Sequence, residues 1–441
     1  MKNSTELENS SLDESNLSNF RAAILGLQHL LAMYSGDILV PLLVGAALGF
    51  STKQITYLVS MDIFMCGIAT LLQLKRTRFT GIGLPVVLGC AIEYVAPLTA
   101  VGKHFGLGTM YGSIIAAGIF IFLISGFFAN IRKLFPPVVT GSLITLIGLT
   151  LIPVAFTNMG GGDVTAKSFG SIPNLIVAGV TIAVILGLNI WGRGFIQQVG
   201  ILIGILVGVV VASFMGKVTL EPVSQANWFQ LPHVFMFAAP KFEWSSIVTM
   251  ILAALTTMIE STGVFFALGD IVGRPIRKDD LKKGYRAEGI AAVLGGIFNT
   301  FPYSTFSQNV GIVQLSGIKT KKPVYFSAFF LIALGLLPKI GAAATVIPAA
   351  VLGGAMLVMF GMVGAQGIKM LREVEGSNSN LLIIGISVSL GLGVTVQPAL
   401  LQALPLTIQT IFGNGLVVGS LSAVILNILF NYGHLNDAIE D

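Results

Sequence analysis

Long apolar runs separated by short polar connections dominate the chain. The runs 24–50, 111–130, 136–156 and 196–214 approach or exceed the roughly 20 residues that a helix needs to cross a bilayer. The apolar run 324–337 is short for a span unless its flanks extend it. This pattern predicts a helical protein that crosses a membrane many times.

Two stretches interrupt the pattern with Pro, Gly and polar residues. They are 81–97 (GIGLPVVLGCAIEYVAP) and 299–317 (NTFPYSTFSQNVGIVQLSG). Each contains a Pro step and then a short run that favours β-structure, 86–88 in the first and 304–306 in the second. Because non-helical backbone is tolerated inside a membrane only where it is buried in protein or lines a cavity, we expect two short strands beside a polar site.

The positions of these stretches predict an internal repeat. Pro85 follows the first span, which begins at Ile24, at nearly the same distance as Pro302 follows the expected start of the eighth span at Ser245. Hydropathy indicates about 14 crossings, seven in each half, so the second half enters the membrane from the opposite side. Paired broken segments in an inverted repeat point to the binding site of a transporter near the bilayer midplane.

These patterns divide the chain into five parts. We expect 1–20, which is polar and acidic without the features of a signal peptide, to be a disordered cytoplasmic tail. The first seven-span repeat is expected at 21–215, an extracellular loop at 216–244, the second repeat at 245–431 and a cytoplasmic tail at 432–441.

Composition and charge support this interpretation. Hydrophobic residues make up 54% of the chain and charged residues only 10%, whereas soluble domains carry about 25% charged residues. The net charge of +5 does not indicate nucleic-acid binding, because the basic residues are spread over loops such as 75–78, 274–286 and 319–322. These loops should face the cytoplasm, which predicts an even number of spans with both termini inside. Cys66 and Cys90 lie in apolar segments without metal-ligand spacing, so we expect core residues, no metal and no cofactor.

Acids within the apolar spans are the first candidates for chemistry, because a charge at the bilayer centre costs about 2.5–3.5 kcal/mol on insertion scales. Glu260 lies mid-span in TMIESTGVFFALG. It could serve as a ligand or proton acceptor, or it could be a structural hydrogen-bond anchor. Glu288 follows a basic loop, where it either takes part in coupling or is solvated near a helix end. Glu93, in the first broken segment, faces either the site or a neighbouring helix. Asp37 and Asp62 are expected to cap or brace helices rather than to act in transport.

Polar residues of the second broken segment suit recognition of a heterocycle. Gln308 and Asn309 can both donate and accept, which matches a ring edge with alternating N–H and C=O groups, although both residues could simply cap the helix that follows. That helix is expected to begin near Gln308 with its positive end toward the site. Glu260 opposite would accept from ring N–H groups. His29 lies well inside an apolar span. It is expected to be either a packing residue or a coupling group.

The stretch 308–317 (QNVGIVQLSG) resembles the signature of the nucleobase/ascorbate transporters, also called the nucleobase-cation symporter-2 family. In that signature Gln-Asn-x-Gly is followed after four residues by Thr and then Arg, Lys or Gly. Ser316 stands where Thr is usual and retains the hydroxyl. The resemblance extends over nearly the whole transmembrane chain and includes Gln28, His29, Leu84, Pro85 and Glu260.

The resemblance implies an all-α polytopic membrane protein of 14 spans in two inverted seven-span repeats, arranged as a core and a gate domain and usually dimeric. It implies that Glu260 and Gln308 hold the base and that Glu288, on the ninth span, contributes to proton coupling. Many relatives have Asp or His where this chain has Val264, so coupling is expected to rely more on Glu260 and Glu288. The remaining substrate-binding residues, of which the backbone would complete the contacts with the base, are Ala91, Ile92, Phe306 and Ser307. The remaining coupling candidates are His29, Asn309 and Glu93.

Gln308 is similar to the purine-type branch, whereas Glu at this position is similar to the uracil carriers. We therefore expect proton-coupled uptake of an oxidised purine across the cell membrane, xanthine first, with a urate or guanine/uracil permease as the alternative and a homodimer as the assembly. An anion transporter of related fold is a second interpretation, against which Glu260 argues. A membrane-embedded enzyme is a third, but the sequence shows neither a nucleophile–base pair nor metal ligands.

Overall fold

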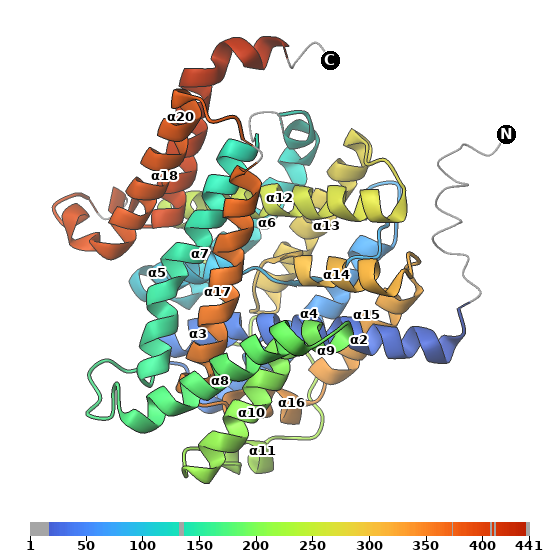
Figure 1. Cartoon of the computed structure of the whole chain (residues 1–441), viewed down its shortest axis with the longest axis vertical. Helices are drawn as coiled ribbons and strands as arrows, with labels where there is room; N and C mark the ends of the chain where they lie inside the picture. Colours follow the sequence, from blue (N-terminus) through green and yellow to red (C-terminus); the bar gives the residue numbers. More distant parts are fainter. Residues whose placement is uncertain (1–16, 132–135, 373, 406–407, 410–411, 438–441) are drawn as a thin grey trace.

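The computed structural model of the chain describes residues 17–131, 136–372, 374–405, 408–409 and 412–437. Most of these residues are helical (Figure 1). Residues 1–16 of the predicted N-terminal tail fall outside the described residues, and its last two residues already belong to the first helix. Of the predicted C-terminal tail, 432–437 continue the last helix, which corrects that boundary, and 438–441 fall outside the described residues.

One group of helices surrounds two short strands, and we call it the strand bundle. Helices from both halves of the chain form it, since α13 packs on α6 and α15 packs on α4 and α2. Its elements are α2 (Asn19–Asp37), α3 (Leu39–Ala47), α4 (Thr52–Leu74), β1 (Leu88–Cys90), η1 (Ile92–Tyr94), α5 (Val95–Phe105), α6 (Leu107–Ile131), α12 (Trp244–Val272), α13 (Lys278–Ile297), β2 (Tyr303–Thr305), α14 (Ser307–Ser316), α15 (Lys322–Gly335) and α16 (Pro338–Thr345).

The remaining long helices form a second bundle, in which α17 packs on α7 and α8, and α18 packs on α20 and α7. It contains α7 (Pro137–Gly160), α8 (Ile172–Trp191), α10 (Gly200–Phe214), α17 (Ala349–Leu371), α18 (Asn378–Val396), η3 (Pro398–Leu401) and α20 (Gly415–Asp437). Two short helices, α9 (Phe195–Gln198) and α11 (Glu221–Gln225), lie in connections. The bundles meet where α12 packs against α20 and α7.

Eight helices among the described residues are long and apolar enough to cross a membrane, which confirms a multi-pass membrane protein. The short run 324–337 belongs to a bent pair of helices, α15 and α16, which meet at an angle of 81°. Together these two helices are long and apolar enough for one span. The run 196–214 is interrupted at Val199, so that only α10 forms its apolar helix.

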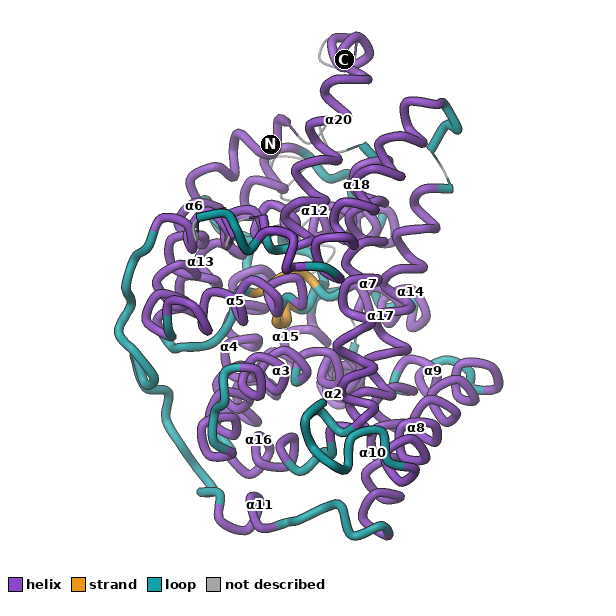
Figure 2. The backbone as a smooth tube through the Cα atoms, turned by 90° about the vertical axis from the view of Figure 1, so that its left-hand side faces the viewer, coloured by secondary structure: helices purple, strands orange, loops and turns teal. Residues whose placement is uncertain are grey.

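The two predicted strands exist, and they pair with each other in antiparallel orientation. The register pairs Leu88 with Thr305, Gly89 with Ser304 and Cys90 with Tyr303. One further hydrogen bond flanks the pair at each end, from Ala91 N to Pro302 O (3.1 Å) and from Phe306 N to Val87 O (3.0 Å). The strands are displaced by one or two residues from the predicted runs, because β-propensity marks residues that fit a pleated surface and does not mark boundaries. Figure 2 shows the pair enclosed by helices.

The chain turns sharply as it enters the first broken segment. Gly81 adopts φ +87°, and a Cβ there would lie 2.2 Å from Lys75 O, so only glycine fits. Arg274, buried between α12 and α13, donates to Ile82 O (3.1 Å) and pairs with Asp280 (2.7 Å). A fully paired charge therefore anchors the backbone that leads into β1.

Candidate functional site

Each strand leads into a helix whose first turn has no side-chain cap. Ala91 and Phe306 occupy the cap positions of η1 and α14 in extended conformation, and neither makes a side-chain capping hydrogen bond. Because the first N–H groups of a helix lack intrahelical partners and lie at its positive end, both turns can bind an acceptor. Glu93 and Gln308 are the second residues after these caps, so they occupy corresponding positions.

Glu260 lies between the two broken segments. Its helix, α12, packs against η1, β2 and α14. Its carboxyl group hydrogen-bonds with that of Glu93, and the adjacent Ser261 Oγ accepts from Thr305 N at the end of β2 (3.5 Å). Since two carboxylates can only accept, a hydrogen bond between them requires a proton on one of them. The half-buried Glu260 and Glu93, which follows β1, therefore form a pair of neighbouring acids.

The predicted base-binding residues of the second segment are accessible. Ser307 and Gln308 are exposed at the start of α14, and Phe306 is half-buried. The Phe306 ring lies against Gly89 and Gly36, which leave room for it because they have no Cβ. These two glycines were not predicted, since their role depends on a contact between distant segments.

The corresponding residues of the first segment are less accessible. Ala91 is 1% exposed and Ile92 is half-buried. For Ala91, therefore, only the backbone at the uncapped turn could reach a ligand.

Glu288 is buried, at 2% exposure, so the alternative of a solvated carboxylate at a helix end is wrong. The Ser261 hydroxyl donates to it, while its Oε1 has no hydrogen-bond partner among the described residues. Ser261 therefore links Glu288 to the end of β2 and adjoins Glu260. This arrangement brings three acids, Glu93, Glu260 and Glu288, close to the strand ends.

His29 and Asn309 contact each other instead of facing the base-binding side chains. Asn309 Nδ2 donates to His29 O (3.0 Å) and lies 3.1 Å from His29 Nδ1. Both side chains are buried. The amide of Asn309 therefore does not cap α14, as one alternative held, but ties that helix to α2.

Asp37 and Asp62 both brace the strands, which was not predicted, and Asp37 also ties α2 to α4 through Cys66, as a helix brace would. Asp37 Oδ1 accepts from Cys90 N (2.7 Å) and from Cys66 Sγ (3.1 Å), and Asp62 Oδ1 accepts from the Tyr303 hydroxyl (2.9 Å). The cause is the strand pair, which places donors beside both acids. The ligand atoms of Asp37, Asp62 and Cys66 lie within 4.8 Å of one another, as a metal site would require, but hydrogen bonds already occupy one oxygen of each acid. Both cysteines are buried, as predicted.

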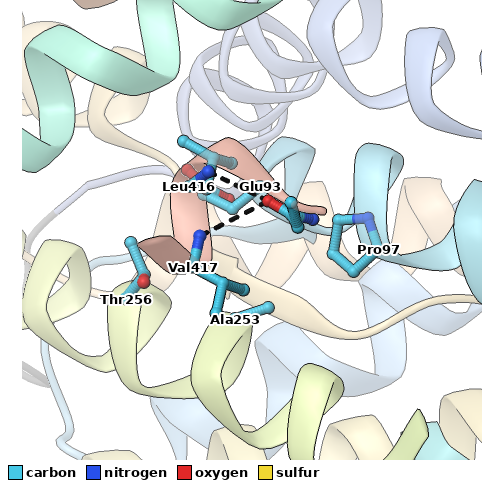
Figure 3. A pocket seen from close by; sticks show the side chains of 7 residues that line it. Glu93, Pro97, Ala253, Thr256, Leu416 and Val417 are labelled. Atoms are coloured by element: carbon cyan, nitrogen blue, oxygen red, sulfur yellow. Dashed lines mark hydrogen bonds between the residues drawn. The ribbon is translucent and has the colours of Figure 1, made fainter. Parts of the chain in front are cut away.

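A small cavity adjoins Glu93, and a larger vestibule shares part of the cavity's lining. The cavity, of about 10 Å³, is lined by Glu93, Pro97, Ala253, Thr256, Asn414, Leu416 and Val417 (Figure 3). The vestibule, of about 660 Å³, lies between α3 and α5 on one side and α7, α18 and residues 409–416 on the other. Lys103 and His104 belong to its lining, and Asn414 and Leu416 line both spaces.

Comparison with known proteins adds three findings. Residues 20–400 match the model of a family described as a permease family, Xan_ur_permease. The chain is 54% identical to xanthine permease of Bacillus subtilis over 92% of its own length and 93% of that protein, and 51% identical to uric acid permease PucK of the same organism over 94% and 96%. The transmembrane domain of the cyanobacterial bicarbonate transporter BicA is similar with a TM-score of 0.64 and 16% identity, covering 88% of this chain and 99% of that one. At this identity the likeness concerns the fold alone.

Proposed function

The chain belongs to the nucleobase/ascorbate transporter family, whose model spans most of its length, and from this premise we propose that it imports an oxidised purine, xanthine first, together with protons. Membership of a permease family makes the protein a transporter and not a membrane-embedded enzyme.

The observation that carries the proposal is the position of Glu260 beside Glu93, on a helix that packs against both uncapped turns, η1 and α14, the second of which presents the exposed Gln308. Xanthine presents ring N–H groups and carbonyl oxygens along its edges. Glu260 would accept from N–H groups, Gln308 would both donate and accept, and free backbone N–H groups near Ile92 and Ser307 would donate to carbonyls. The Phe306 ring would pack on the base.

The acids supply the coupling part of the proposal. The carboxyl groups of Glu93 and Glu260 share a hydrogen bond that requires a proton, and Glu288 is a third buried acid beside them. Moving an unpaired charge through a membrane interior is costly, so the loaded carrier would reorient only after its acids are protonated. His29 and Asn309 would hold α14 against α2 during this step.

We also propose the finer architecture. Fourteen crossings would consist of the eight long helices, the bent pair α15–α16, α10, α20, α13 and the two segments that combine a strand with a half-helix. The strand bundle would be the core and the second bundle the gate of a cell-membrane protein with both termini cytoplasmic. Only 28% of the apolar stretch of α8 and 22% of that of α18 is buried within the chain. The uncovered faces of these two helices would contact lipid or the second copy of a homodimer.

Two other substrate classes remain candidates on specific observations. Urate is the closest, because PucK, a uric acid permease by name, matches this chain at nearly the same identity as the xanthine permease. An inorganic anion is suggested by the fold of BicA, but three acids near the strand ends would repel it.

A competition experiment tests the proposal. Uptake of labelled xanthine is measured against unlabelled xanthine, urate, guanine and uracil, with Glu260→Gln beside the matched control Glu221→Gln, whose exposed carboxyl group lies in α11. We expect xanthine to compete best and Glu260→Gln to abolish uptake although the protein reaches the membrane. Near-normal uptake by Glu260→Gln would remove this residue from the site.

A further inference from the structure

On the premise that the protein is the proton-coupled importer described above, we infer that Glu93 is the group through which protons from the vestibule reach Glu260, by way of a single water site beneath the first turn of α20. Three polar residues, Glu93, Thr256 and Asn414, stand among the otherwise apolar lining of a defined cavity, which shares one wall with the vestibule.

The cavity crosses the boundary between the two bundles (Figure 3). Glu93 and Thr256 belong to the strand bundle, whereas Asn414, Leu416 and Val417 belong to the second bundle. Its volume of about 10 Å³ suits one water molecule, which needs two to four polar partners. Glu93, Thr256 and Asn414 provide such partners.

Two buried polar atoms of the lining residues lack hydrogen-bond partners among the described residues. They are Oε2 of Glu93, which is 4% exposed, and Nδ2 of Asn414, which is 7% exposed. A buried polar group left unpaired costs about 1–3 kcal/mol. A water between them would accept from Asn414 and donate to Glu93, satisfying both.

Asn414 also fixes the helix end that faces Glu93. Its Oδ1 accepts from Leu416 N (2.9 Å) and Val417 N (3.4 Å). The dashed lines that start at Leu416 and Val417 in Figure 3 mark these two bonds. Because Asn414 and Leu416 line both the cavity and the vestibule, one layer of side chains separates Glu93 from the larger space. With both termini cytoplasmic, as proposed above, the start of α20, where this space lies, faces the outer side of the membrane.

Acidic and neutral groups face Glu93 from different sides. Glu260 from α12 lies against it, and Glu288 from α13 lies near Glu260. The lining residues from the α20 side carry no titratable side chain. Glu93 is thus placed between the acids of the strand bundle and the N-terminal end of α20.

The transfer step balances with one proton. The Glu93–Glu260 pair begins with a single shared proton. A hydronium ion in the cavity gives a second proton to Oε2 of Glu93 and remains as water, while the first proton passes fully to Glu260. Two neutral carboxyl groups result, and the net uptake is one proton from the vestibule.

Uptake of labelled xanthine at varied external pH and constant internal pH tests the inference in reconstituted vesicles. Four proteins are compared: wild type, Glu93→Gln, Thr256→Val and Ser420→Ala. Thr256→Val is nearly isosteric and removes a hydroxyl from the cavity, but it also removes the contact of Thr256 Oγ1 with Ser420 Oγ (3.4 Å). Ser420→Ala removes that contact and leaves the cavity lining unchanged, so it is the matched control.

We expect external acid to stimulate wild type and Ser420→Ala alike, Glu93→Gln to lose the stimulation, and Thr256→Val to reduce it by at least about threefold. A wild-type pH profile for Glu93→Gln would overturn the inference, and so would equal effects of Thr256→Val and Ser420→Ala. If Glu93→Gln does not fold, the Thr256 and Ser420 variants decide. Failure of the proposed function is a separate result, in which wild type does not exchange labelled for unlabelled xanthine even at equal pH.

Discussion

Replacement of Gly89 by Ala should weaken xanthine binding through Phe306. The backbone of Gly89 does not have positive φ, so alanine adds no backbone strain there. The added methyl group, however, would lie 2.4 Å from Phe306 Cε2 and 2.7 Å from Cδ2. Since carbon atoms pack at about 3.5–4.0 Å, the ring must move by about 1 Å. Overpacking of this kind costs about 1–3 kcal/mol. If binding of the base requires the ring in its original position, this cost opposes binding and corresponds to roughly a 5- to 150-fold rise in Kd.

Binding of labelled xanthine to purified protein measures this effect, and thermal unfolding shows whether each variant is folded. Gly36→Ala should weaken binding less, because its methyl group would lie 3.0 Å from the same ring. Gly385→Ala, in α18 with no atom within 4 Å of the added methyl, is the control and should bind as wild type does. Unchanged affinity in folded Gly89→Ala would refute the placement of Phe306 in the site.

Three further predictions test other residues. Gln308→Glu should shift selectivity away from xanthine and urate toward uracil, because a carboxylate loses the donor for a carbonyl and repels an anion; competition assays measure the shift. Glu288→Gln should exchange xanthine across vesicle membranes but fail to accumulate it under a pH difference. Partial burial works to raise the pKa of Glu243, which caps α12, but hydrogen bonds from Ser245 and Ser246 outweigh it and hold the pKa at about 2. Because folding lowers this pKa, the ionised Glu243 stabilises the folded protein above about pH 4.5, and this stabilisation is lost as the pH falls toward 2. The Tm of wild type should therefore fall more steeply than that of Glu243→Gln over this range.

The membrane fold and the two broken segments were predictable because both depend on local composition. A run of about 20 apolar residues indicates a span whatever surrounds it, and Pro85 and Pro302 mark backbone that cannot continue as an ordinary helix. Family membership is confirmed, and the stretch that begins at Gln308 was sufficient to suggest it.

What could not be predicted depends on contacts between distant segments. Asp37 and Asp62 were assigned to helices because the pairing of β1 with β2, which brings Cys90 N and the Tyr303 hydroxyl to them, leaves no local pattern. The position of Glu93 remained open for the same reason. Its neighbours Glu260 and Asn414 lie far away in the sequence, and only packing brings them together.

Xanthine accumulation in vesicles under an imposed pH difference tests the central claim most directly. Wild-type protein is reconstituted, labelled xanthine is added outside, and uptake is followed with the interior alkaline, with equal pH, and with a protonophore. The account predicts accumulation above the external concentration only while the pH difference lasts, accompanied by a rise in external pH. Xanthine uptake that is indifferent to the pH difference, or the absence of xanthine uptake from a correctly folded protein, would contradict it.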